Sequence, residues 1–227
     1  MDSIANIRSQ FADKLAAKEF VGNTIEIIGA SFVADHETIF GKPNQDYVQR
    51  ELDWYLSLSR RVDDIPGGAP KIWKQIASDD GLINSNYGYL LLSHENGGQL
   101  AHVISELIQN PGSRRATAIY TRPSIHNEWN TNGMADFICT NAVQYLIRGG
   151  RLDVVVQMRS NDAIFGYRND YAWQKYVQRV ILAMLKDEGL EIEPGNIIWN
   201  AASLHIYERH FRLVQKFMLT GEYDTDL

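Results

Sequence analysis

The spacing of apolar side chains along this chain predicts a mixture of helices and strands. Ile4, Ile7, Phe11 and Leu15 recur at helical spacing and predict a helix over residues 3–18. Apolar and polar positions of the same periodicity predict further helices over residues 45–60, 98–109, 171–187 and 205–217. Apolar, β-branched segments predict strands over residues 24–33, 116–122 and 197–203.

The clearest local unit is a hairpin. The segments FICTNAVQYLIR and RLDVVVQMR flank Gly149-Gly150, which is a strong signal for a two-residue turn. Strands and helices are mixed along the chain without strict βαβ alternation. The pattern therefore predicts an α+β fold with a mixed sheet.

The register of this hairpin places chemically useful side chains together. Cys139 is expected to pair with Ser160, and Thr140 with Arg159. Because side chains alternate between the two faces of a strand, Cys139 and Arg159 can serve one site only if a bulge re-aims one of them. We therefore expect a bulge here.

The helix expected over residues 45–60 carries a carboxylate on its apolar side. The expected inward stripe is Val48, Leu52, Tyr55 and either Leu58 or Ser59, and Glu51 lies within it. A carboxylate in such a position is either an acid/base group or half of a structural ion pair.

Composition narrows the class of protein. The 227 residues fit one domain with a large core, so we expect a single domain over residues 1–227. With 44% hydrophobic and 22% charged residues the chain is typical of a globular protein. The net charge of -6 argues against a surface for duplex nucleic acid, and no direct DNA binding is expected. The net charge does not argue against a small anionic ligand, because a few local arginines would suffice to bind one.

The sequence also indicates a compartment. Its one cysteine cannot form an intramolecular disulfide, which fits a reducing environment. The first residues, MDSIANIRSQ, lack the basic start and apolar run of a signal peptide, and no stretch approaches the roughly 18 apolar residues of a membrane span. We expect a cytoplasmic protein that does not bind a membrane.

Several common chemical signatures are missing from the sequence. It has no Walker A loop, no GxGxxG, no HExxH and no CxxC. The six histidines, at positions 36, 94, 102, 126, 205 and 210, show no metal-ligand spacing. No metal is expected.

Single residues are ambiguous when taken alone. A lone cysteine such as Cys139 is usually a small buried hydrophobe, although Arg159 is a candidate to stabilise its thiolate. Arg114-Arg115 either holds a phosphate or is a solvated surface pair. Asp170 either recognises a ligand or caps the helix that follows it.

Several segments, taken in order, resolve this ambiguity because together they resemble the thymidylate synthase family. The resemblance spans roughly residues 24 to 217. It rests on the segments RELDWYL, KIWKQIASDDGLINSNYG, NPGSRR, CTNAVQYLIRGGRLDVVVQMRSNDAIFGYRND and SLHIYERH.

The resemblance implies a fold, a partner and a set of roles. The fold would be a mixed β-sheet flanked by helices that pairs sheet to sheet in a homodimer. The catalytic residues would be Cys139 as the nucleophile, Glu51 and Tyr87 in proton transfer, and Asp170 at the base. The 5′-phosphate and sugar would be held by Arg159, Ser160, His205 and Tyr207, with Arg114 and Arg115 reaching across the dimer interface. The co-substrate 5,10-methylenetetrahydrofolate would face Ile72, Trp73 and Asp162.

Two positions depart from the synthases of this family. Thr140 stands where they have His, and Asp170 stands where they have the Asn that reads uracil. Both changes make the chain similar to the phage deoxycytidylate hydroxymethylases of the family. The change to Asp170 has a physical reading: N3 of cytosine accepts and its 4-amino group donates, so a carboxyl group that shares one proton with N3 matches cytosine.

The resemblance therefore implies transfer of a one-carbon unit from 5,10-methylenetetrahydrofolate to C5 of dCMP through a covalent bond from Cys139 to C6. Addition of water would give 5-hydroxymethyl-dCMP, as expected for phage DNA modification. The alternatives are a dUMP or CMP hydroxymethylase, a thymidylate synthase, or a non-catalytic nucleotide- or RNA-binding relative. The presence of Cys139 and Glu51 argues against the last, because binding alone needs no thiol.

Overall fold

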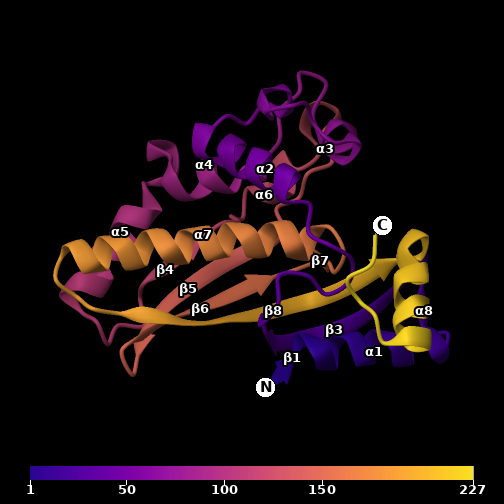
Figure 1. The fold of residues 1–227 in the computed structure, drawn as a ribbon. Coiled ribbons are helices and arrows are strands. Elements are labelled where there is room, and N and C mark those ends of the chain that lie inside the picture. Colours follow the sequence, from indigo (N-terminus) through magenta and orange to yellow (C-terminus); the bar gives the residue numbers. More distant parts are fainter. Residues whose placement is uncertain (227) are drawn as a thin grey trace. The chain divides into compact units, whose positions relative to one another are not determined.

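The computed structural model describes residues 1–226, which form two compact units. One unit combines Met1–Asn44 with Ile147–Leu227, and the other is Gln45–Leu146. Figure 1 shows the elements of both. The single-domain organisation stays a prediction. Within the described residues no helix combines the length and apolar character needed to cross a bilayer.

The first unit is built on a mixed sheet. Its strands follow the order β1-β3-β8-β6, with β2 on β3 and β7 on β8. The long strand β8 pairs antiparallel with β3 and parallel with β6. The strand bounds are β1 Asp2–Ser3, β2 Phe20–Val21, β3 Thr24–Val33, β6 Arg151–Met158, β7 Asn161–Asp162 and β8 Glu193–Tyr207.

Alternation along these strands separates a buried face from an open one. Phe32 of β3 and Trp199 of β8 are fully buried and pair in register. Gly29 has φ 68° and shifts the alternation, so that Ile27 and Ala30 both point into the core. The opposite face carries Ile28, which is 81% exposed.

Three helices accompany this sheet. Helix α1 (Ile4–Ala16) packs against β3, α7 (Gly166–Asp187) packs against β6 and β8, and α8 (Phe211–Thr220) packs on α1. Figure 1 shows α7 running along β6 and β8. Tyr167 of α7 stacks edge-on against Trp199 at 5.1 Å between ring centroids.

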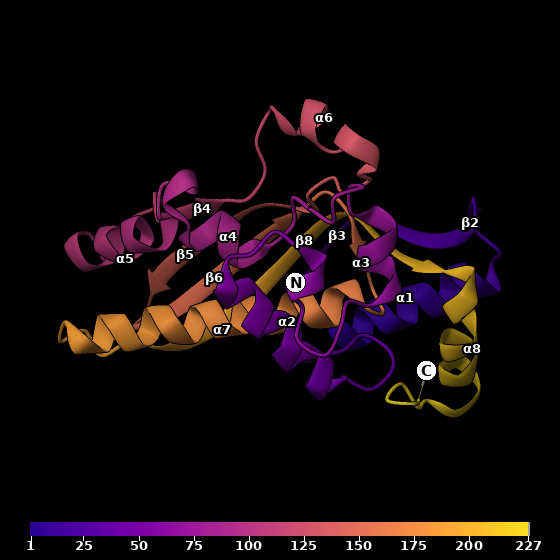
Figure 2. The same ribbon diagram turned by 90° about the horizontal axis from the view of Figure 1, so that it is seen from above.

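The second unit is mainly helical. Its helices are α2 (Gln45–Ser57), α3 (Lys71–Ile76), α4 (Tyr87–Leu92), α5 (Gln99–Gln109) and α6 (Ile125–Glu128). Strand β4 (Thr117–Ile119) pairs antiparallel with β5 (Thr140–Arg148), and α5 lies beside β4, as Figure 2 shows. Helix α4 approaches α2 so closely that a Cβ on Gly88 would lie 1.9 Å from the Tyr55 carbonyl oxygen. Only glycine fits there, and this contact fixes the start of α4.

Most predicted elements are present, and the mixed α+β sheet is confirmed. Strand β5 ends at Arg148 and β6 begins at Arg151, so the two-residue glycine turn is confirmed. Its expected register across the turn, and the bulge, stay predictions.

Three local predictions were wrong. Residues 205–207 continue β8 instead of starting a helix, because β8 stays paired with β3 as far as Tyr207. Helix α2 ends at Ser57, since Leu58 adopts a left-handed conformation with φ 59°. The buried residues of α2 are Tyr47, Glu51, Trp54 and Tyr55, so the inward stripe is rotated from the expected one.

Candidate active site

The predicted site residues are divided between the two units. The second unit holds Glu51, Ile72, Trp73, Tyr87, Arg114, Arg115 and Cys139. The first unit holds Arg159, Ser160, Asp162, Asp170, His205 and Tyr207.

Glu51 is a buried carboxylate held by two donors. It lies on α2 and is 4% exposed. The Tyr47 hydroxyl, one helical turn earlier, donates to Glu51 Oε1 at 2.7 Å. Trp73 Nε1 donates to the Tyr47 oxygen at 2.8 Å and to Glu51 Oε1 at 3.2 Å. Burial and the nearby Glu51 charge raise the pKa of Tyr47 well above its usual range, so its hydroxyl keeps its proton and remains a donor.

Aromatic rings tie this carboxylate to the neighbouring helices. The ring of Trp73 on α3 meets Trp54 of α2 at 5.4 Å, and Trp54 stacks on Tyr55 at 5.5 Å. Tyr55 stacks in turn on Tyr87 of α4 at 5.6 Å. Contacts of this kind restrict each ring to one orientation, so α2, α3 and α4 form a rigid support for Glu51.

Tyr87 is hydrogen-bonded to Thr140, the residue that follows Cys139 in the sequence. The Thr140 hydroxyl donates to the Tyr87 oxygen at 2.9 Å, and both residues are buried. Cys139 lies directly before β5, outside the strand, and its Sγ is 3.8 Å from the Phe137 carbonyl oxygen. Cys139 is half-buried. The hydrogen bond from Thr140 therefore anchors Tyr87 at the residue next to Cys139, whose side chain is partly accessible.

The cations of the second unit lie elsewhere. Arg114 and Arg115 are exposed in the loop between α5 and β4. Arg115 pairs with Glu106 at 2.8 Å while its side chain stays 75% exposed. Ile72 on α3 is 56% exposed and forms an apolar surface beside Trp73.

In the first unit, β7 and β8 bring Asp162 and His205 together. These two residues are register partners in the parallel pair. Asp162 Oδ1 accepts the Ile164 backbone N–H at 3.0 Å, which fixes the turn into α7. Burial lowers the pKa of His205, while Asp162 and Glu26 act in the opposite direction and Arg159 adds to the lowering. His205 is therefore held largely neutral near pH 7.

Tyr207 and the loop after β6 complete this group. The His205 and Tyr207 rings meet edge-on at 5.1 Å, and the Arg209 guanidinium lies 4.2 Å above the Tyr207 ring. Arg159 and Ser160 follow β6 directly and are half-buried.

Asp170 does not cap the start of a helix. Helix α7 begins at Gly166, five residues earlier than the sequence pattern predicted, so Asp170 lies inside the helix, one turn beyond its start. Asn161 Nδ2 donates to Asp170 Oδ2 at 2.8 Å. The carboxylate is therefore oriented by a neighbour from β7.

Three further residues belong to this arrangement and were not indicated by the sequence. They are Tyr47, Thr140 as a hydrogen-bond donor to Tyr87, and Asn161. Tyr47 could have been found from its position four residues before Glu51, because residues at this spacing lie on the same helix face. The contacts of Thr140 and Asn161 join different elements and leave no periodic signal.

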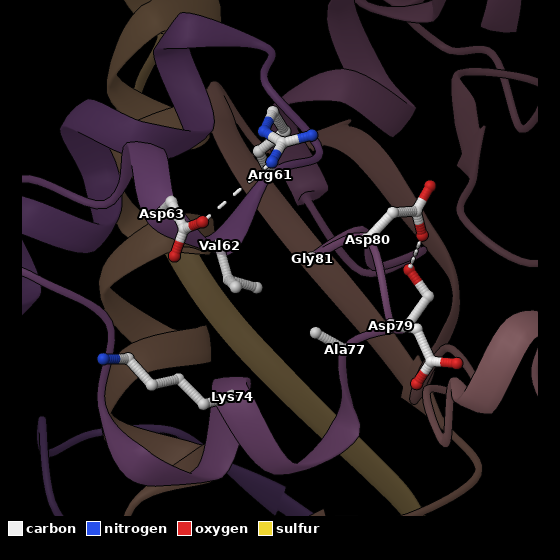
Figure 3. A pocket seen from close by; sticks show the side chains of 9 residues that line it. Arg61, Val62, Asp63, Lys74, Ala77, Asp79, Asp80 and Gly81 are labelled. Carbon is white, nitrogen blue, oxygen red and sulfur yellow. Dashed lines mark hydrogen bonds and ion pairs between the residues drawn. The ribbon is translucent and has the colours of Figure 1, made fainter.

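An open pocket of about 410 Å³ lies in the second unit (Figure 3). Its rim carries charges of both signs, with an ion pair between Arg61 and Asp63 at 4.0 Å and a Ser78 hydrogen bond to Asp80 at 2.6 Å. Lys74 of α3 forms another part of the wall. The residues described around this pocket include none of the predicted site residues. Within residues 1–226, no cluster of three or more His, Cys, Asp or Glu side chains is arranged to hold a metal ion.

Comparison with known proteins gives consistent matches. The model of the family described as thymidylate synthase matches residues 42–224. The deoxycytidylate 5-hydroxymethyltransferase of Enterobacteria phage T4 is 52% identical over 227 residues, covering 97% of this chain and 92% of that protein. The thymidylate synthase of Fusobacterium nucleatum is 33% identical over 214 residues, covering 92% of this chain and 74% of that protein.

The fold has a counterpart among solved structures. Thermostable thymidylate synthase A from Bacillus subtilis aligns with a TM-score of 0.69 over 96% of this chain and 86% of that chain. At 22% identity this match shows a shared fold.

Proposed function

Because this chain belongs to the thymidylate synthase family, we propose that it transfers a one-carbon unit from 5,10-methylenetetrahydrofolate to C5 of dCMP and gives 5-hydroxymethyl-dCMP. Two lines support the proposal. The chain is 52% identical to the phage T4 and T2 proteins named deoxycytidylate 5-hydroxymethyltransferase. The side chain at the base-reading position is a carboxylate, Asp170.

Besides the 52% identity to those proteins, Asp170 is the chemical observation that favours cytosine. A carboxyl group that shares one proton with N3 accepts from the 4-amino group through its other oxygen. Uracil presents the opposite pattern, with an N3–H donor and an O4 acceptor. An Asp at this position therefore favours dCMP over dUMP.

The covalent chemistry would begin at Cys139. Its thiolate adds to C6 of the pyrimidine, which makes C5 nucleophilic. C5 forms a bond to the methylene carbon supplied by the folate and then loses its proton. Departure of tetrahydrofolate leaves an exocyclic methylene group at C5. Water adds to that carbon, and the Cys139 thiolate leaves C6 to restore the aromatic ring.

Glu51 would assist the proton transfers in these steps. A positioned general acid or base typically contributes about 10²–10⁴-fold to a rate. Tyr47 and Trp73 hold one carboxylate oxygen, so the carboxyl group has a fixed direction. Tyr87 and Thr140 would extend the network toward Cys139.

The remaining residues would bind the two substrates. Ile72 and Trp73 offer an apolar surface on α3 for the folate rings. Asp162 would accept from pterin N–H groups through oxygen lone pairs beyond those used by the α7 turn. Arg159 and Ser160 would hold the phosphate, and His205 and Tyr207 the sugar.

We also propose that the protein is a homodimer. The open face of the first unit's sheet carries apolar side chains that alternate with the buried ones, among them Ile28 at 81% exposure. Burial of such a face against a second copy is favourable. The exposed Arg114 and Arg115 would then reach the phosphate site of the other subunit.

The test is incubation with dCMP, dUMP or CMP together with methylenetetrahydrofolate, followed by product mass measurement. We expect 5-hydroxymethyl-dCMP, with oxygen from labelled water in the new group. Methylated product without that label would contradict the proposal. Cys139→Ala should abolish turnover while nucleotide binding persists. Full turnover by this variant would contradict the covalent mechanism.

A further inference from the structure

Asn161 is a buried amide with a carboxylate as its partner. It lies at the start of β7, paired in register with Leu204 of β8, and is 3% exposed. Its Nδ2 donates to Asp170 Oδ2 at 2.8 Å. Since the backbone of Asn161 and of Asp162 after it is paired with β8, the amide has little freedom to move away from this oxygen.

The amide also has a defined orientation. Its Oδ1 is buried without a hydrogen-bond partner. Rotating the amide would bring that oxygen against the Asp170 carboxylate, which is electrostatically unfavourable. The pair is further enclosed by the first residue of α7: a Cβ on Gly166 would lie 3.1 Å from Asn161 Nδ2 and 3.8 Å from Asp170 Oδ2.

We propose that Asn161 is a specificity-determining residue because it decides which oxygen of Asp170 carries the proton shared with the base. The proposal rests on the function proposed above and concerns the same site. An N–H directed at Oδ2 stabilises that oxygen as an unprotonated acceptor. The shared proton is therefore placed on Oδ1. Oδ2 accepts from the 4-amino group of cytosine, and Oδ1 bridges through the proton to N3.

The same contact disfavours uracil. A protonated Asp170 would match uracil by accepting from N3–H through Oδ1 and donating to O4 through Oδ2. That arrangement needs the proton on the oxygen that Asn161 already occupies with a donor. A protonated oxygen is a weaker acceptor than an unprotonated one, so the hydrogen bond from Asn161 would be weakened in that state. Asn161 thus disfavours a protonation state that would admit dUMP, a role that Asp170 cannot perform alone.

Asn161→Leu tests this idea because leucine fills a similar volume and removes the donor. The smaller Asn161→Ala serves if leucine disturbs the fold, and circular dichroism checks both. Binding of dCMP and dUMP is measured by calorimetry at about pH 8 and about pH 6. We expect dUMP binding to strengthen by about tenfold, the scale of one hydrogen bond to a charged group, and dCMP binding to change less. The gain for dUMP should be larger at the lower pH, because uracil needs a protonated Asp170.

Gln178→Leu is the matched control. Gln178 is a fully buried amide on α7 whose Nε2 donates to the Leu152 carbonyl oxygen at 2.9 Å. Its loss perturbs the core without touching Asp170. An unchanged preference for dCMP over dUMP in both folded Asn161 variants, or an equal change in Gln178→Leu, would overturn the inference. Failure of the proposed function is read separately, from the products of the unaltered enzyme with each nucleotide.

Discussion

Removal of one hydroxyl group tests the support of the buried carboxylate. In Tyr47→Phe the ring remains, but the donor 2.7 Å from Glu51 Oε1 is lost. A hydrogen bond to a charged group contributes about 1.5–3 kcal/mol. The Trp73 N–H already lies 3.2 Å from the same oxygen and can turn fully toward it. We therefore expect the lower end, about 1.5 kcal/mol in the free energy of unfolding.

The assay has a thermal and a kinetic arm. For a chain of this size, about 1.5 kcal/mol lowers the Tm by about 3–6 °C. We expect kcat with dCMP to fall about tenfold, since a misdirected carboxylate loses part of its contribution to proton transfer. Trp73→Phe removes the second donor. The free energy of unfolding of the Tyr47→Phe/Trp73→Phe double variant should fall by more than the sum of the two single decreases, because each donor partly replaces the other.

Tyr89→Phe is the control for this experiment. Tyr89 lies on α4, where the Arg60 guanidinium stands 5.6 Å from its ring, and the loss of its hydroxyl leaves the Glu51 contacts in place. The reasoning is refuted if Tyr47→Phe matches Tyr89→Phe in both Tm and kcat. A normal kcat with a lowered Tm would assign the Tyr47 contact to stability alone.

Three further predictions concern the pH response, the dimer and the base. Burial lowers the pKa of His205, so the unfolded chain binds more protons than the folded chain as the pH falls. The contribution of His205 to the free energy of unfolding is therefore complete above about pH 6.5 and is lost as the pH falls through the His205 pKa. His205→Gln should flatten the dependence of the free energy of unfolding on pH, measured in thermal melts, by up to about 1.4 kcal/mol per pH unit. Ile28→Lys should shift the mass in sedimentation toward the monomer, whereas Met184→Lys, an exposed position on α7, should not; equal behaviour would exclude the sheet face as the interface. Asp170→Asn should move the ratio of kcat/KM from dCMP toward dUMP, with Asp187→Asn as the control at the far end of α7, and an unchanged ratio would refute the base assignment.

The site was only partly predictable for a physical reason. Glu51 was recognisable because a carboxylate among apolar neighbours at helical spacing is visible in one segment of sequence. Tyr47 lies one turn before Glu51 on the same helix, but Trp73 belongs to α3, and only packing brings its N–H to the same oxygen. The face of α2 also differed from the expected one, because the large rings of Tyr47 and Trp54 are buried in place of Val48 and Leu52.

For Cys139 and Asp170 too, the sequence identified the residues, whereas the structure decided their positions and neighbours. The ordered motifs identified both residues and their expected roles from sequence alone. The structure places Cys139 outside β5 and moves Asp170 inside α7. One partner of Asp170, Asn161, is nine positions away in β7, at a separation that belongs to no helix or strand period.

What the sequence by itself determined is local: the glycine turn after β5, the extent of β3, most of the longer helices, and the residues able to carry chemistry. The tertiary structure alone decided where β8 ends, since HIYERHF fits either period and nine register pairs with β3 keep residues 205–207 extended. It also decided which donor meets which carboxylate. Hydrogen-bond partners on separate elements are selected by packing, and packing depends on the whole chain at once.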